Sequence, residues 1–134
     1  MKPSDYMTDE DIRHEKEKCL KDMVVMAGMA ENWRKSYIRQ ARRDAPKDGY
    51  DGWEYMVLEL SDEIETHIAP YAERFYKCGY MTKDEVWGWL AVVEEQEEIL
   101  RHELEELAEE GRKLEREKHS LKARIKRKLI GWLQ

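Results

Sequence analysis

The sequence predicts an all-α protein, a small helical bundle in which two N-terminal helices pack on a very long C-terminal helix that forms a coiled coil. Three observations predict this fold. Of the 134 residues, 40% are charged while Gly (7) and Pro (3) are scarce, which is the composition of long helices. Apolar residues recur at steps of three and four. Helix-capping residues precede two of the three apolar patterns.

The chain is long enough for one structural domain. We divide it into an N-terminal helical pair, residues 1–81 with a linker near 45–52, and a long coiled-coil helix, residues 82–134. Gly111 is a candidate hinge in the second part. The five Trp, seven Tyr and seven Met supply material for a core, so the composition is not that of a disordered chain.

The first helix is predicted to begin at Thr8, a capping residue followed by acids in the first turn. We expect it to run to about Arg43 and to stop before Pro46, because the residue before a proline avoids helical geometry. The Met-rich stretch Met23–Ala30 is predicted to pack in the core rather than to form a binding groove.

The second helix is predicted from one apolar stripe that runs from Trp53 to Cys78. Pro70 lies inside the stripe, so we expect a break near Thr66. Gly79 is predicted to end the helix. His67 lies on the stripe, and we expect it to be a core residue.

The third helix is predicted to begin with the capping box formed by Thr82 and Glu85. Apolar residues then follow a heptad pattern over more than five heptads, a pattern typical of a coiled coil. The first half of this pattern is expected to pack on the protein's own helices, whereas residues 112–133 have too little chain left to cover them. The predicted coiled-coil interface consists of Leu100, Leu104, Leu107, Leu114, Leu121 and Ile125.

The charge of the long helix changes sign at Gly111. Residues 82–110 carry 2 bases and 11 acids, and residues 111–134 carry 9 bases and 2 acids. Three arrangements satisfy this pattern: a fold-back at Gly111, an antiparallel pairing of two copies, or a basic half that binds an anion. We favour an antiparallel homodimer with its two-fold axis near residues 107–111, because it sets acid against base.

Three kinds of side chain are candidate contacts with partners. The basic half could neutralise phosphates of a nucleic acid, through Arg112, Lys113, Arg116, Lys122, Arg124, Lys126, Arg127 and Lys128. The acidic half could meet a basic partner, through Glu94, Glu95, Glu97, Glu98, Glu105, Glu106 and Glu109. Trp87 and Trp89 are candidate binding hot spots at the start of the helix.

No motif for catalysis is present, and we expect neither a cofactor nor a metal. All four histidines follow a Glu by four residues, for example Glu63 and His67, which is the spacing of an ordinary helical pair. Carboxylate metal bundles use a spacing of three. Cys19 and Cys78 are isolated, which indicates reduced thiols in a cytoplasmic protein, or in the host cytoplasm if the protein is viral.

These observations favour a non-enzymatic interaction or regulatory protein that forms a homodimer and binds an unidentified protein. The first alternative is a nucleic-acid-binding protein that uses the basic half. The second is an acidic inhibitor that mimics DNA and blocks a nucleic-acid enzyme, as small viral anti-defence proteins do. Membrane binding through the apolar end of the chain is disfavoured, because the acidic stretch repels anionic surfaces.

Overall fold

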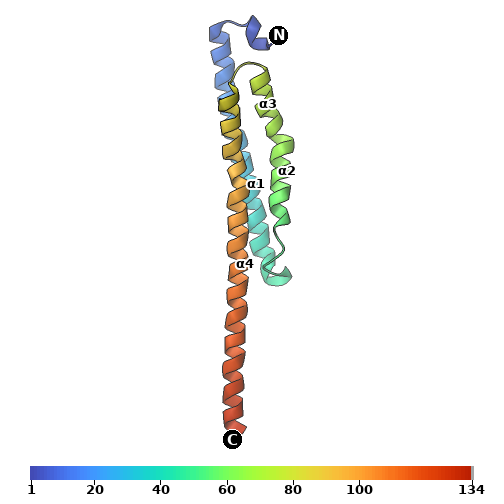
Figure 1. The fold of residues 1–134 in the computed structure, drawn as a ribbon, viewed down its shortest axis with the longest axis vertical. Helices are drawn as coiled ribbons and strands as arrows, with labels where there is room; N and C mark the ends of the chain where they lie inside the picture. Colours follow the sequence, from blue (N-terminus) through green and yellow to red (C-terminus); the bar gives the residue numbers. More distant parts are fainter. Residues whose placement is uncertain (134) are drawn as a thin grey trace.

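The computed structural model describes residues 1–133 and confirms the all-α fold. A short 3-10 turn, η1 (Pro3–Tyr6), precedes four helices, which are α1 (Asp9–Asp48), α2 (Tyr55–His67), α3 (Ala69–Lys77) and α4 (Lys83–Leu133). Helices α2 and α3 run back along α1, and α4 then lies alongside α1 in the same direction (Figure 1). The three shorter helices all contact the first half of α4.

Helix α1 begins as predicted, because Thr8 Oγ1 accepts a hydrogen bond of 3.2 Å from the Asp11 N–H. Its predicted end at Arg43 is wrong, since the helix continues through Pro46 to Asp48. A proline in the last turn removes one backbone hydrogen bond and leaves the helix before it intact. Gly49 then ends the helix with a φ of 106°, and its N–H donates to the Ala45 carbonyl over 2.8 Å.

The predicted break in the second helix is present, and it separates α2 from α3 at Ile68 rather than at Thr66. Pro70 lies in the first turn of α3, where its missing N–H has no partner to lose. Because of the break, Ile68 takes the buried position that the periodic pattern assigned to His67. Ile68 is fully buried, and His67 is exposed. The expectation that His67 is a core residue is therefore wrong. Helix α3 ends at Lys77, two residues before Gly79, as predicted.

Helix α4 begins with the predicted capping box. The Thr82 N–H donates to Glu85 Oε1 over 3.0 Å, and the Glu85 N–H donates to Thr82 Oγ1 over 3.2 Å. The Lys16 ammonium lies 2.8 Å from the other Glu85 oxygen and links this end of α4 to α1. The helix then continues without interruption through Gly111, so the chain neither folds back nor bends there.

The hydrophobic core lies where α1, α2 and α3 surround the first half of α4. Met23, Met26 and Ala30 of the Met-rich stretch lie in this core as predicted, whereas Val24, Val25 and Met29 of the same stretch are exposed. One half-buried polar contact also crosses the bundle. The Arg34 guanidinium of α1 binds Glu103 and donates to Gln96 Oε1 over 2.6 Å, and both partners belong to α4. Hydrogen bonds to charged groups of this kind hold the two parallel helices in register.

Candidate functional site

The second half of α4 extends beyond the bundle as a single helix (Figure 1). Every residue from 112 to 133 is exposed, and we call this segment the free half of α4. The cause is the length of the neighbouring helices. Helix α1 ends at Asp48 and α2 begins at Tyr55, so the turn between them marks the lower end of the bundle. No second layer of the described chain covers α4 below that level.

One apolar row crosses this boundary. Its first four members are at most 2% exposed. Leu114 is 45% exposed and Leu121 is 51% exposed, although they continue the same heptad position. The same row is therefore core in the first half of α4 and surface in the second half. The four buried members are Val86, Val93, Leu100 and Leu107.

This boundary divides the predicted coiled-coil interface. Leu100, Leu104 and Leu107 pack in the protein's own core, while Leu114, Leu121 and Ile125 are exposed. The predicted two-fold axis near residues 107–111 remains a prediction. On the face that holds Leu100, Leu104 and Leu107, a partner helix paired about that point would meet α1 and α2.

Four exposed apolar residues of the free half lie along one side. At 100° per residue, Leu114, Leu121, Ile125 and Trp132 fall within a narrow sector, which we call the stripe. Lys118 and Lys128 interrupt it. A shallow groove of about 620 Å³ lies beside Leu121 and Ile125, between the side chains of Arg124, Arg127 and Lys128. Ile130 is equally apolar and exposed, but the same spacing places it on the opposite side of the helix.

A notch lies where the free half leaves the bundle. Tyr50, in the turn after α1, packs directly over Gly111. A Cβ atom at position 111 would lie 2.4 Å from the Tyr50 Cβ and 2.6 Å from its Cγ, so the glycine allows a close approach. The resulting cavity, which we call the Tyr50 notch, has a volume of about 470 Å³. It is lined by Pro46, Tyr50, Gly111, Leu114, Glu115, Glu117, Lys118 and Leu121.

Ion pairs connect the acidic and basic halves of α4 across Gly111. The Arg112 guanidinium donates to Glu105 over 2.7 Å and to Glu109 over 2.8 Å, and Arg116 donates to Glu109 over 3.1 Å. Hydrogen bonds from the two arginines lower the pKa of Glu109, and the same carboxylates raise the pKa of Arg112. The change of charge at this glycine therefore supports a straight helix.

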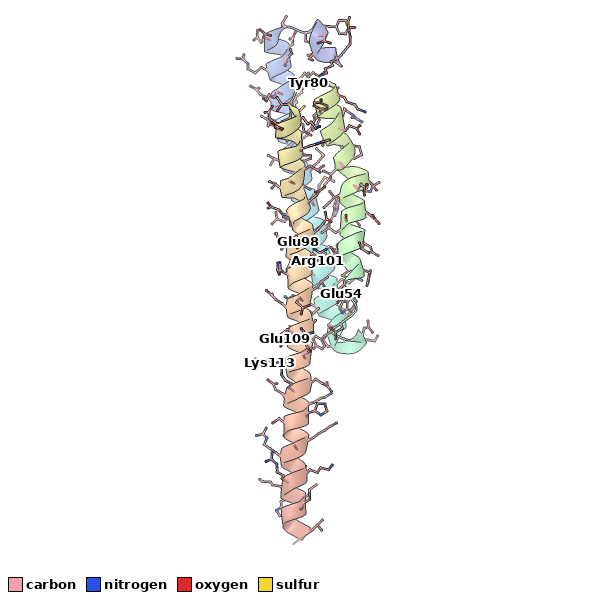
Figure 2. The ribbon with its side chains drawn as sticks, in the orientation of Figure 1. Glu54, Tyr80, Glu98, Arg101, Glu109 and Lys113 are labelled. Atoms are coloured by element: carbon pink, nitrogen blue, oxygen red, sulfur yellow. The ribbon has the colours of Figure 1, made fainter. Side chains whose placement is uncertain are left out.

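The remaining bases of the free half are Lys113, Lys118, Lys122, Arg124, Lys126, Arg127 and Lys128. All of them are exposed, and helical spacing distributes them around the whole circumference rather than on one side. Figure 2 shows Glu109 and Lys113 at the level where the bundle ends. The basic side chains thus surround the stripe instead of forming a separate patch.

The acidic candidates of α4 lie mostly on its outer side. Glu94, Glu95, Glu98, Glu105, Glu106 and Glu109 are exposed. Glu97 does not belong to this surface, because it is half-buried. Burial raises the pKa of Glu97, and a hydrogen bond with Ser61 of α2 partly opposes that rise. Arg101 pairs with Glu98 within the acidic surface (Figure 2).

The two tryptophans at the start of α4 have different environments. The Trp89 indole N–H donates to the Met23 carbonyl of α1 over 3.1 Å, and its ring packs against the core. Trp87 is 43% exposed. Trp89 therefore serves the bundle, and Trp87 is the member of the pair that remains available to a partner.

The histidines are not gathered into a site. Within residues 1–133, no three His, Cys, Asp or Glu side chains lie close enough together to hold a metal ion. His67 packs edge-on against Trp33 with ring centroids 6.2 Å apart. Both line a groove of about 580 Å³ between α1 and the α2–α3 pair. The sequence analysis assigned the whole stretch Met23–Ala30 to the core, whereas Val25 and Met29 of that stretch line this groove.

The sequence also gave no indication of the Tyr50 notch. Tyr50 and Gly111 are far apart in the chain, and each alone resembles an ordinary turn or helix residue.

No stretch in the helices of residues 1–133 is both long and apolar enough to cross a bilayer. No family model, no curated protein and no solved structure matches this chain.

Proposed function

We propose that this protein is a non-enzymatic interaction protein that joins two copies of itself through the free half of α4. The bundle formed by residues 1–110 would then be presented twice in one assembly. The observation that carries the proposal is the apolar row that is buried up to Leu107 and exposed at Leu114 and Leu121. A second copy supplies apolar side chains with the same heptad spacing.

The energetics of a single helix in water support this proposal. Most helices in proteins gain their stability from packing of an apolar side rather than from helix propensity. The free half has that apolar side without a neighbour in its own chain. Burial of Leu121 and Ile125, each 51% exposed, would stabilise it by roughly 25 cal/mol for every Å² of apolar surface removed from water.

Nucleic-acid binding is the second candidate, and the nine basic residues of the free half favour it. Two observations weigh against it. Arg112 and Arg116 are already engaged by carboxylates of the acidic half. The outer acidic surface of α4 also lies directly above the basic segment, where it would repel phosphates. An inhibitor that mimics DNA would instead use that outer surface and would leave the stripe unexplained.

The test is the solution mass of matched variants, measured by sedimentation equilibrium over a range of concentrations. The wild-type protein should show twice the 16.2 kDa of one chain. Leu121→Asp places a charge on the stripe and should give a monomer. Ile130→Asp places the same charge at a site of nearly equal exposure, 53% against 51%, on the opposite side, and should leave the dimer intact.

Two further variants separate the alternatives. Lys126→Glu, Arg127→Glu and Lys128→Glu, combined in one chain, should abolish binding to duplex DNA if the protein binds nucleic acid. Glu94→Gln, Glu95→Gln and Glu98→Gln should abolish inhibition of a nucleic-acid enzyme if the protein mimics DNA. A wild-type protein that stays monomeric at every concentration would contradict the proposed self-association.

A further inference from the structure

We infer that two copies pair end to end with their free halves antiparallel, so that Trp132 of each copy occupies the Tyr50 notch of the other. The two-fold axis then passes at the level of Ala123. This inference rests on the proposed function and specifies its interface. It replaces the pairing near residues 107–111, which the bundle blocks on the buried face of α4.

The stripe is self-complementary in this register. Leu114 lies opposite the partner's Trp132, and Leu121 lies opposite the partner's Ile125. In each pair the two residues are equally far from Ala123 along the helix, on either side of it, as a two-fold axis at that level requires. The stripe thus forms four apolar layers, of which two pair a leucine with a tryptophan and two pair a leucine with an isoleucine. Lys118 lies opposite the partner's Lys128, and the axis repeats this layer once. Both lysine layers oppose pairing unless the ammonium groups reach water while their stems cover the apolar edges.

The bundle itself restricts the register. The stripe continues the face of α4 that α1 and the α2–α3 pair cover above residue 111. A partner helix on this face therefore extends upward until its tip meets the turn that contains Tyr50. Shifting the pairing by a heptad toward the bundle would drive the tip into α1, and shifting it outward would lose apolar layers. A parallel pairing would place the partner's bundle in the space of α1 and α2.

The notch fits a large, partly polar aromatic side chain. Trp132 is 77% exposed in the single chain, and a tryptophan can bury roughly 150–250 Å². The notch is apolar where Pro46, Tyr50 and Leu114 line it, and it carries carboxylates at Glu115 and Glu117. Its volume of about 470 Å³ leaves room for the indole and neighbouring atoms of the partner's last turn. Gly111 lets the Tyr50 side chain lie close to α4 at the edge of this space.

Each free half carries nine bases and two acids, so two paired free halves repel overall, and the positions of the acids make the antiparallel direction the less repulsive one. Glu115 and Glu117 are the two acids of residues 112–133, and both lie near the bundle. The partner's Lys128 lies near the far tip, and antiparallel pairing brings it within a turn of Glu117 on the same flank of the stripe. In a parallel pair these groups would stay roughly 15 Å apart along the axis, which exceeds the screening length of about 8 Å at physiological salt.

Disulfide trapping tests the register. The background is Cys78→Ser, which keeps the buried Cys19. Leu114→Cys and Trp132→Cys are made in separate chains, mixed and mildly oxidised. A covalent dimer should form in the mixture. Leu114→Cys alone should form none, because its two copies would lie roughly 27 Å apart. A mixture of Ile130→Cys and Leu114→Cys is the matched control, and it should also remain unlinked.

Binding measurements on Trp132 provide a second test, because they depend on no cross-link. Trp132→Ala should raise the dimer dissociation constant at least about tenfold, as expected for a buried aromatic anchor. Trp132→Phe should restore most of the affinity. Leu133→Ala changes a neighbour that is 88% exposed and off the stripe, and it should have no effect. Tyr50→Ala should weaken the dimer too, and its effect should not add to that of Trp132→Ala.

The outcomes separate this inference from the proposed function. A wild-type monomer by sedimentation would overturn both. A dimer in which Leu114→Cys cross-links with itself would overturn the antiparallel pairing and keep self-association. A dimer whose affinity is unchanged by Trp132→Ala would overturn the role of the notch.

Discussion

Gly111 illustrates how one residue can serve packing in a helix that never bends. The residue lies at the point where α4 changes charge, and its lack of a side chain admits the Tyr50 ring. A glycine inside a helix costs about 1 kcal/mol relative to alanine. The contact with Tyr50 closes the lower end of the bundle and forms the notch, which offsets this cost.

Replacing Gly111 by alanine should therefore lower stability despite the better helix propensity. The new Cβ would lie 2.4 Å from the Tyr50 Cβ, so the turn must shift, and we expect a net loss of about 1 kcal/mol in the free energy of unfolding. Gly28→Ala is the matched control. Nothing lies within 4 Å of a Cβ at Gly28, so this change should stabilise the protein by about 1 kcal/mol. Urea unfolding measures the free energy of unfolding of both variants. If both gained equal stability, the Tyr50 side chain would have moved aside at no energetic cost, which would contradict the prediction.

Glu97 is a second residue with an energetic conflict. Burial raises its pKa, so the folded state disfavours the charged form, and the side chain reduces stability above its unfolded pKa. This cost disappears as the pH falls through the raised pKa. Glu97→Gln keeps a partner for Ser61 and removes the charge, so it should raise the Tm at pH 7. Thermal melts near pH 3.5 should show little of this advantage, and a lower Tm at pH 7 would contradict it.

At the scale of elements, the start of α4 is held by its capping box and by α1. The Lys16 ammonium and the Thr82 N–H lower the pKa of Glu85 from 4.5 to about 2. A lowered carboxyl pKa contributes stability above 4.5, and this contribution is lost as the pH falls toward 2. The Glu85 side chain is 36% exposed, so solvent screening limits the ion-pair part.

Glu85→Gln should accordingly lower the Tm at pH 7, because the amide can still accept the Thr82 hydrogen bond but no longer attracts Lys16. The difference from the wild type should shrink below pH 4.5 and vanish near pH 2. Thermal unfolding followed by circular dichroism across this range checks the trend. Glu95→Gln, an exposed change in the same helix, should follow the wild type, and a pH-independent deficit for Glu85→Gln would exclude the charge effect.

The same scale shows what the sequence could and could not predict. Thr8, Thr82 and Glu85 marked helix starts correctly, because capping depends on residues within one turn. The heptad pattern gave the length of α4. The end of α1 was missed because packing of Ala45 in the core carries the helix past Pro46. The Tyr50 notch could not be predicted, since it depends on a contact between distant segments.

At the scale of the whole molecule, the bundle and the free half should be energetically separable. The buried residues of α4 end at Ala108. Truncation after Lys113 therefore removes exposed helix and leaves the core complete. The free energy of unfolding of the monomer should change by less than about 1 kcal/mol. The wild-type Tm should rise with protein concentration, as linkage to a dimer requires, and that of the truncated chain should not.

The layout of charge along α4 also has a kinetic consequence. Residues 1–110 carry 15 bases and 28 acids, and residues 111–134 carry 9 bases and 2 acids. The rod-shaped molecule therefore has a large electric dipole moment along its long axis (Figure 1). In the inferred dimer the two basic halves overlap and the acidic bundles lie at opposite ends, so the two dipoles meet with their positive ends together and repel. Salt screens this repulsion, so the association rate constant should rise as ionic strength rises.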